Sequence, residues 1–192
     1  MGDDRTEGAA AGRVRSDARR NRQILLEAAA AAFIENGVDA PVRDIAARAG
    51  VGMGTLYRHF PTRADLIIAV YQHQIDACAT AGPELLARTD PYQALTTWVD
   101  MFVDLLVTKH GLAAALHSDS ARFEALHAYF LDQLLPVATQ LLTAASEAGD
   151  IVSGVEAYGL LRGIGNLCIG DGDGRYDPRT LVGLLIAGLR TR

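Results

Sequence analysis

Apolar residues recur at helical spacing along most of this chain. In the first such segment, one face of a helix would carry Ile24, Leu25, Ala28, Ala32 and Phe33. Alanine and leucine dominate the composition, β-branched residues are sparse, and no stretch alternates apolar and polar residues as a half-buried strand does. The pattern therefore predicts an all-α protein.

Capping and helix-breaking residues divide this pattern into about nine helices. Asn36-Gly37 is typical of a helix end, because Gly37 can adopt the left-handed conformation that follows many helices. The Asp-Pro pairs at 90–91 and 177–178 are typical of helix starts, with a cap followed by a proline in the first turn. The expected helices cover about 16–36, 41–49, 52–59, 62–82, 91–109, 111–117, 121–148, 154–170 and 178–190, with a kink at Pro136.

Charge is distributed unevenly along the chain, which has a net charge of −5. The segment 13–63 contains nine arginines and five acidic residues, a net charge of +4, whereas 64–192 contains 8 basic and 15 acidic residues, a net charge of −7. A basic segment joined to an acidic remainder indicates a polyanionic partner for the basic segment alone.

Other features favour a cytoplasmic protein. Cys78 and Cys168 have no CxxC spacing, so we expect buried thiols in a reducing compartment. The first residues lack the apolar core of a signal peptide, and no run of about 18 apolar residues is long enough to span a membrane. The charged start "MGDDRTEGAAAG" predicts a flexible N-terminal arm over 1–15.

The stretch "VRDIAARAGVGMGTLYRHF" at 42–60 fits a helix-turn-helix. Its first helix has a small apolar face, and Gly50 stands where a sharp turn favours positive φ. Val51 and Leu56 would bury the next helix against the preceding ones and leave its polar side chains facing outward. In this motif the second helix lies in the major groove of DNA.

The longer stretch "ILLEAAAAAFIENGVDAPVRDIAARAGVGMGTLYRHFPTRADLI" resembles the DNA-binding domain of the tetracycline-repressor (TetR) family, and the match extends over about Arg20 to Gln72. The resemblance implies an all-α homodimer that binds an operator and usually represses transcription. It also implies a larger C-terminal domain that binds a small-molecule inducer and dimerises. We therefore expect a DNA-binding domain over 16–62 and a regulatory and dimerisation domain over 63–192.

The resemblance also implies DNA-contacting residues. Tyr57 and His59 match positions that contact mainly phosphates, and Arg63 matches the usual lysine that anchors a phosphate at the start of the fourth helix. Gly52 departs from the commoner serine, so a capping hydroxyl is missing there. The expected contacts are Arg15, Arg19, Arg43, Gly52, Met53, Gly54, Thr55, Tyr57, Arg58, His59 and Arg63.

Elementary chemistry agrees with several of these contacts. Arg43 and Arg58 can each bind O6 and N7 of a guanine with two hydrogen bonds, and Arg15 and Arg19 can reach the DNA backbone or minor groove as arms do elsewhere. For each of these residues the alternative is a solvated surface side chain, whereas we expect Phe60 in the core.

Polar and aromatic groups on the later apolar helices could line a ligand pocket. The candidates are Tyr71, Gln74, Trp98, Phe102, His117, His127, Phe130 and Asn166. The alternative is that the aromatics form core and that the histidines have partners inside it. No histidine or cysteine pair has zinc-ligand spacing, so we expect no metal and no cofactor.

The last two expected helices carry more apolar surface than one helix pair can hide. Gly159 and Gly163 are one turn apart and permit close helix approach, and in the TetR family the last two helices often form a four-helix bundle across a two-fold axis. The expected dimer contacts are Leu160, Gly163, Ile164, Leu167, Leu181, Leu184 and Leu185.

The sequence thus predicts a ligand-released repressor that binds a palindromic operator as a homodimer. An alternative is the same DNA-binding head in an activator, or in a ligand-independent nucleoid-associated protein. We do not expect an enzyme, because no Ser/His/Asp, paired-carboxylate or metal arrangement forms a recognisable motif. "GIGNLCIG" has no preceding strand for a dinucleotide site, and "DGDGRYD" lacks the closing glutamate of a calcium loop.

Overall fold

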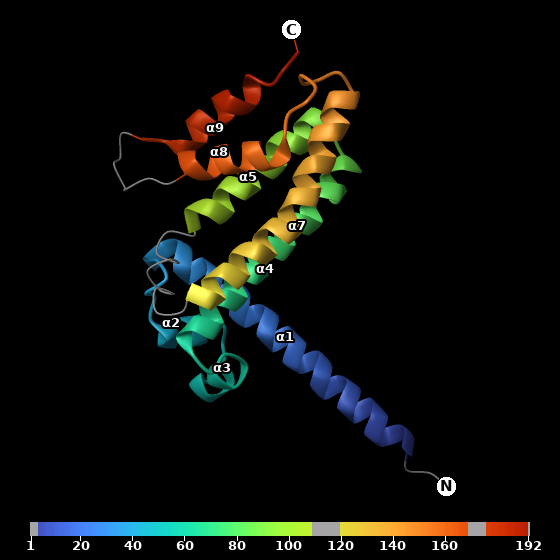
Figure 1. Cartoon of the computed structure of the whole chain (residues 1–192). Coiled ribbons are helices and arrows are strands. Elements are labelled where there is room, and N and C mark those ends of the chain that lie inside the picture. The colour runs from blue at the N-terminus through green and yellow to red at the C-terminus, as the bar shows by residue number, and fades with distance from the viewer. Residues whose placement is uncertain (1–3, 109–119, 169–175, 192) are drawn as a thin grey trace. The chain divides into compact units, whose positions relative to one another are not determined.

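The computed structural model describes residues 4–108, 120–168 and 176–191, with the backbone alone for 4–18, 107–108 and 120. Over these residues the chain is all-α, as predicted, with eight helices (Figure 1). They are α1 (Asp4–Asn36), α2 (Val42–Arg48), α3 (Met53–His59), α4 (Arg63–Leu86), α5 (Pro91–Thr108), α7 (Ser120–Glu147), α8 (Ala157–Leu167) and α9 (Pro178–Ala187). The short helix predicted over 111–117 lies outside the described residues.

The chain divides into two compact units, Met1–Val70 and Tyr71–Arg192. The sequence placed this division between 62 and 63, ahead of α4, whereas the structural division falls inside that helix. Leu66, Ile67 and Val70, on the first turns of α4, are all buried. These turns extend the first unit because their apolar side chains contribute to a core.

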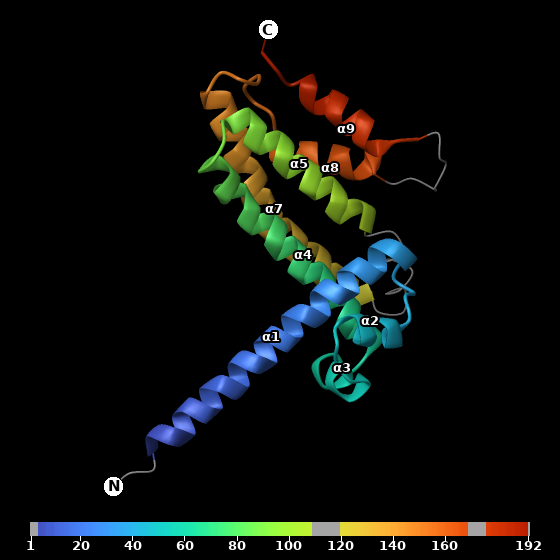
Figure 2. The same ribbon diagram turned by 180° about the vertical axis from the view of Figure 1, so that it is seen from behind.

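In the first unit, α1 packs against α2, and α2 packs against α3 (Figure 2). The buried stripe of α1 includes Leu25, Leu26 and Phe33, and the helix ends before Gly37, whose φ is +70°. The sequence predicted a helix over about 16–36, but α1 begins at Asp4. In the added segment Ala9, Ala10 and Ala11 favour a helix, whereas Gly8 and Gly12 do not. The flexibility of 1–15 stays a prediction.

The turn between α2 and α3 has the predicted glycine geometry. Gly50 has a φ of +68°, and the amide of Val51 donates to the carbonyl of Ala46 at 3.0 Å. The carbonyl of Ala46 lies in α2, whose buried residues are Ile45 and Ala46. The turn therefore closes tightly onto α2 and leads directly into α3.

In the second unit, α5 packs against α7, α8 and α9, while α8 packs against both α7 and α9. An ion pair between Asp104 and Arg179 joins α5 to α9. Backbone hydrogen bonds join the end of the described chain to the turn after α7. Val152 N donates to Leu189 O at 2.8 Å, and Thr191 N donates to Asp150 O at 3.1 Å. No helix in the described ranges is both long and apolar enough to cross a membrane.

The predicted end of the fourth helix at Gly82-Pro83 is wrong, because α4 continues to Leu86. The reason is tertiary. A Cβ on Gly82 would lie 2.2 Å from Cγ1 of Val137 in α7, so the glycine allows α4 and α7 to approach closely. The missing amide hydrogen of Pro83 costs one helical bond, which this close packing outweighs.

Gly82→Ala should therefore destabilise the protein although alanine favours helices. The stiff, β-branched Val137 cannot move aside easily, and we expect a loss of about 1–3 kcal/mol in the free energy of unfolding from overpacking. Gly165→Ala on α8 is the matched control, because a Cβ there meets nothing within 4 Å. Urea denaturation of both variants provides the measurement, and equal stabilities would contradict the close approach of α4 to α7.

Gly50→Ala should destabilise the first unit by about 1–2 kcal/mol, the cost of a left-handed conformation in an L-residue. Gly52→Ser is the control, because Gly52 caps α3 with an ordinary φ of −74° and no side-chain hydrogen bond. A serine there should leave the free energy of unfolding unchanged or raise it by about 0.3 kcal/mol. Thermal unfolding of both proteins measures the difference, and an alanine tolerated at position 50 would refute the turn geometry.

Candidate nucleic-acid interface

Helix α3 is held in place by two buried side chains. Leu56 is 1% exposed and Phe60, directly after the helix, is 2% exposed. The guanidinium of Arg22 in α1 lies over the Phe60 ring, 5.6 Å from its centroid. Leu56 and Phe60 were both predicted to be buried. A helix of seven residues is not stable alone, so this packing fixes where α3 lies.

The opposite face of α3 is open. Met53 is 37% exposed and Tyr57 47% exposed, and Gly54 and Arg58 are exposed beside them. A Cβ built on Gly54 meets no atom within 4 Å. The helix therefore presents a ring, a cation and a bare stretch of backbone on one side, which suits the groove of a nucleic acid.

Most other predicted DNA contacts are also accessible. Arg19 is exposed on α1, and Arg43 on α2 is 84% exposed with only a 3.6 Å ion pair to Asp44. Thr55 and His59 are half-buried on α3. Three further predicted residues stand apart: Gly52 caps α3, Arg15 lies in α1 with its side chain outside the description, and Arg63 is half-buried.

Arg63 is hydrogen-bonded inside the first unit. Its Nη2 donates to the backbone carbonyl of Val38 and, at 2.8 Å, to that of Ala40. Both carbonyls lie in the loop between α1 and α2. Arg63 therefore has a structural partner that its sequence position did not predict.

A second arginine, which the sequence analysis did not single out, joins α1 to α2. Arg48 donates to Glu35 through both arms, with Nη1–Oε1 at 2.9 Å and Nη2–Oε2 at 2.5 Å. The hydrogen bond from the guanidinium lowers the pKa of Glu35. A separation of 13 residues across a turn gives no sequence signal, since opposite charges are common on surfaces.

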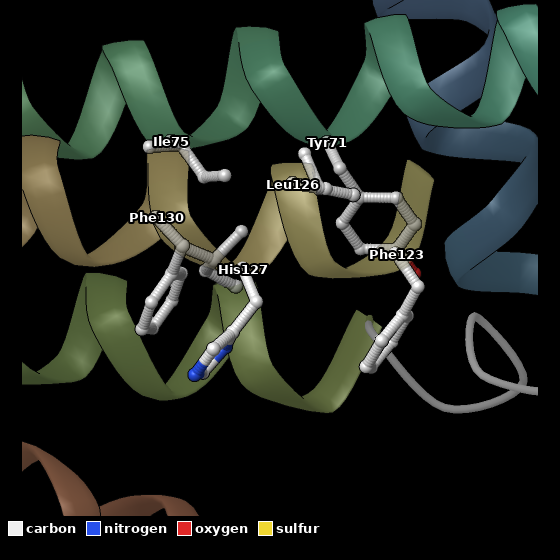
Figure 3. Close-up of a pocket in the computed structure, with 7 residues that line it drawn as sticks. Tyr71, Ile75, Phe123, Leu126, His127 and Phe130 are labelled. Carbon is white, nitrogen blue, oxygen red and sulfur yellow. The ribbon is translucent and has the colours of Figure 1, made fainter. Parts of the chain in front are cut away.

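The second unit contains a small cavity between α4, α5 and α7 (Figure 3). Its volume is about 10 Å³, room for about one water molecule. Tyr71 and Ile75 project into it from α4, facing Leu126 and Phe130 of α7. Its remaining lining residues are Leu105, Phe123 and His127. Burial raises the pKa of the Tyr71 hydroxyl above its ordinary value.

Only some of the predicted ligand residues meet at this cavity. Tyr71, His127 and Phe130 line it, whereas Trp98 and Phe102 stack on each other inside the core with centroids 5.6 Å apart. The indole nitrogen of Trp98 donates to Cys78 O at 2.8 Å.

The other predicted ligand residues lie elsewhere. Asn166 is exposed on α8, and His117 falls outside the described residues. The Oε1 atom of Gln74 is buried with no hydrogen-bond partner. Both cysteines are buried free thiols, as predicted, and burial raises the pKa of Cys78 to about 12.

The predicted dimer residues also separate into two groups. Leu160 and Ile164 of α8 are buried within the chain itself, at 8% and 0% exposure, so they belong to the core of the second unit. On α9, Leu184 is 65% exposed, and Leu181 and Leu185 are 37% and 36% exposed. Gly163 and Leu167 are half-buried.

Comparisons with known proteins agree with this architecture. The model of the bacterial regulatory proteins of the tetR family matches residues 25–70, and the model of the transcriptional regulator SbtR-like C-terminal domain matches residues 90–191, more than half of the chain. An HTH-type transcriptional regulator of Staphylococcus aureus (strain USA300) is 28% identical over 123 residues, which are 63% of this chain and 66% of that relative. That match spans just under two thirds of the relative's length.

Solved structures extend the likeness over most of the chain. A TetR transcriptional regulator from Streptomyces coelicolor is 34% identical, with a TM-score of 0.75, and the match covers 88% of this chain and 98% of that one. The transcriptional regulator FadR from Bacillus subtilis, in complex with stearoyl-CoA, shares the fold at 21% identity and a TM-score of 0.59, over 88% of this chain and 98% of that one. The chain therefore belongs to the TetR family of DNA-binding transcriptional regulators, a family without enzymatic activity.

Proposed function

We propose that this chain is a cytoplasmic repressor that binds a palindromic operator as a homodimer and is released by a small-molecule ligand. The observation that carries the DNA-binding mode is the open face of α3, where Tyr57 and Arg58 are exposed while Leu56 is buried. In this arrangement α3 enters the major groove. Tyr57 and His59 hold phosphates, and Arg43 and Arg58 contact bases or phosphates. Gly52, Met53, Gly54 and Thr55 approach the groove, and Arg15 and Arg19 the backbone.

The exposed leucines of α9 support the dimer. Three large apolar side chains on one helix are costly to leave in water, at about 25 cal/mol for each Å². A symmetric pairing of α8 and α9 with a second copy would cover Leu181, Leu184 and Leu185. A dimer of this kind suits an operator whose two half-sites lie about one turn of DNA apart.

The cavity in the second unit supports the proposal of a ligand only if the cavity can enlarge. Drug-sized ligands need about 300–1,000 Å³, whereas this cavity measures about 10 Å³. A ligand of that size bound in this cavity therefore requires a rearranged state, and a ligand that prefers this state lowers operator affinity by linkage. The solved complex of the transcriptional regulator FadR from Bacillus subtilis with stearoyl-CoA, in a protein that shares this fold, supports the proposal of a ligand.

The small volume of this cavity is also the observation that favours the alternative, a DNA-binding head that acts without any ligand. Genome-wide binding of the protein separates the two. A repressor should occupy a few palindromes and leave them when a metabolite screen finds the ligand. A nucleoid-associated protein should occupy many sites and respond to no metabolite.

Tyr57→Phe should weaken operator binding without changing the fold. Loss of one hydrogen bond to a phosphate costs about 1 kcal/mol, or roughly fivefold in affinity per subunit. Tyr92→Phe is the matched control, because Arg190 stacks on the Tyr92 ring and that contact survives the change. Fluorescence anisotropy with an operator duplex measures both variants, and equal affinities would remove Tyr57 from the interface.

Leu184→Glu should convert the dimer into a folded monomer, because it places a charge in an apolar interface. Ile34→Glu on α1 is the matched control, since Ile34 is 64% exposed and Leu184 is 65% exposed. Sedimentation equilibrium should give one chain mass, 20.5 kDa, for Leu184→Glu and twice that for the control. A dimer that survives Leu184→Glu would place the interface elsewhere.

A further inference from the structure

The hydrogen bonds of Arg63 close the helix-turn-helix into a ring. Its Nη2 donates to the carbonyls of Val38 and Ala40, across a separation of 25 residues in the first case. The two acceptor residues are 5% and 1% exposed. The loop that carries them is itself folded tightly, with Gly37 at a φ of +70° and Ala40 N donating to Gly37 O at 3.1 Å. Both ends of the segment 38–63 are therefore joined by one side chain.

The position of Arg63 on α4 is fixed by a capping box. Thr62 N and Oγ1 donate to Oδ2 of Asp65 at 3.0 and 2.7 Å, and Asp65 N donates to Thr62 Oγ1 at 3.1 Å. This reciprocal pair sets the first turn of the helix. Arg63 lies between the two capping residues, so its side chain leaves α4 in a defined direction.

The ring encloses both helices of the motif. Starting from the loop before α2, the chain runs through α2, the Gly50 turn and α3, and then reaches α4 after the buried Phe60. A long segment with free ends samples many conformations, and joining its ends through hydrogen bonds reduces the number of conformations. If the guanidinium turned to a DNA phosphate instead, two part-buried carbonyls would lose this donor, which is costly.

We propose that Arg63 is a positioning residue for operator binding. It holds α3 at the angle at which Tyr57 and Arg58 meet DNA, and it does so by closing the ring rather than by contacting a phosphate. The inference rests on the proposed operator binding. It differs from the role that the sequence position predicts, in which the cation at this place anchors the DNA backbone.

The experiment compares three arginines with two measurements. Arg63→Gln and Arg63→Lys are tested beside Arg43→Gln, which alters an exposed side chain of the interface, and Arg88→Gln, which alters an exposed arginine beyond α4. The probe is a duplex selected by the wild-type protein from a random pool. Its dissociation constant is measured against salt concentration at a temperature where every variant is folded. The unfolding temperature is measured without DNA.

The positioning role predicts a specific combination for Arg63→Gln. Affinity should fall about tenfold, the order of one lost charge-assisted hydrogen bond, while the slope of log affinity against log salt stays at the wild-type value. The unfolding temperature should fall by a few degrees, on the order of 4 °C. Arg63→Lys should show an intermediate affinity, because its ammonium ends one bond short of Nη2. Arg43→Gln should show the reverse, a shallower slope and unchanged stability.

Three results would overturn the proposal. A slope that becomes shallower by about 0.9 per subunit in Arg63→Gln would assign a phosphate contact to this residue. Wild-type affinity in folded Arg63→Gln would reduce the ring to a stabilising role. Full affinity in Arg63→Lys with a loss in Arg63→Gln would show that charge alone matters. If Arg63→Gln does not fold, the affinity, the salt slope and the unfolding temperature of Arg63→Lys are compared with those of the wild type instead. Failure of the wild type to select any duplex would instead refute the proposed operator binding.

Discussion

Burial of Leu56 and Phe60 is the constraint on which the functional surface depends. Forming the first turn of a helix is unfavourable, and an isolated helix of seven residues has little chance of forming in water. Here α3 also begins at a glycine cap without a side-chain hydrogen bond and contains Gly54. Its helical state therefore comes from packing against the first unit. As a consequence, the outer face of α3 can carry residues that contribute little to helix stability, including Gly54 and the exposed Tyr57 and Arg58.

Local signals in the sequence were sufficient for most of the fold. The left-handed glycines at 37 and 50 and the Asp177 cap of α9 were predicted, because each depends on neighbours within a few residues. Periodicity was sufficient for the core side of α1 and α3. In these places the local preference of the chain and the packing of the whole unit agree.

Sequence reasoning failed where distant residues decide the outcome. Gly82-Pro83 looks like a helix end, but the approach of Val137 from α7 keeps α4 helical there. The pairs Arg48–Glu35 and Arg63–Val38 join residues separated by 13 and 25 positions, and nothing in the local pattern of charges identifies them. The aromatic candidates for a ligand site could not be divided into core and cavity residues for the same reason. Trp98 and Phe130 each lie on the apolar face of a helix, and the sequence pattern does not say which of them faces a cavity.

The small volume of the cavity between α4, α5 and α7 has a kinetic consequence. For a ligand that binds there, diffusion to the surface is not the slow step, because the walls formed by Tyr71, Leu126 and Phe130 must first separate. Collective motions of packed helices take microseconds to milliseconds. The rate at which such a regulator responds would then saturate as ligand concentration rises, and its ceiling would be set by how often the protein opens rather than by how much inducer the cell contains.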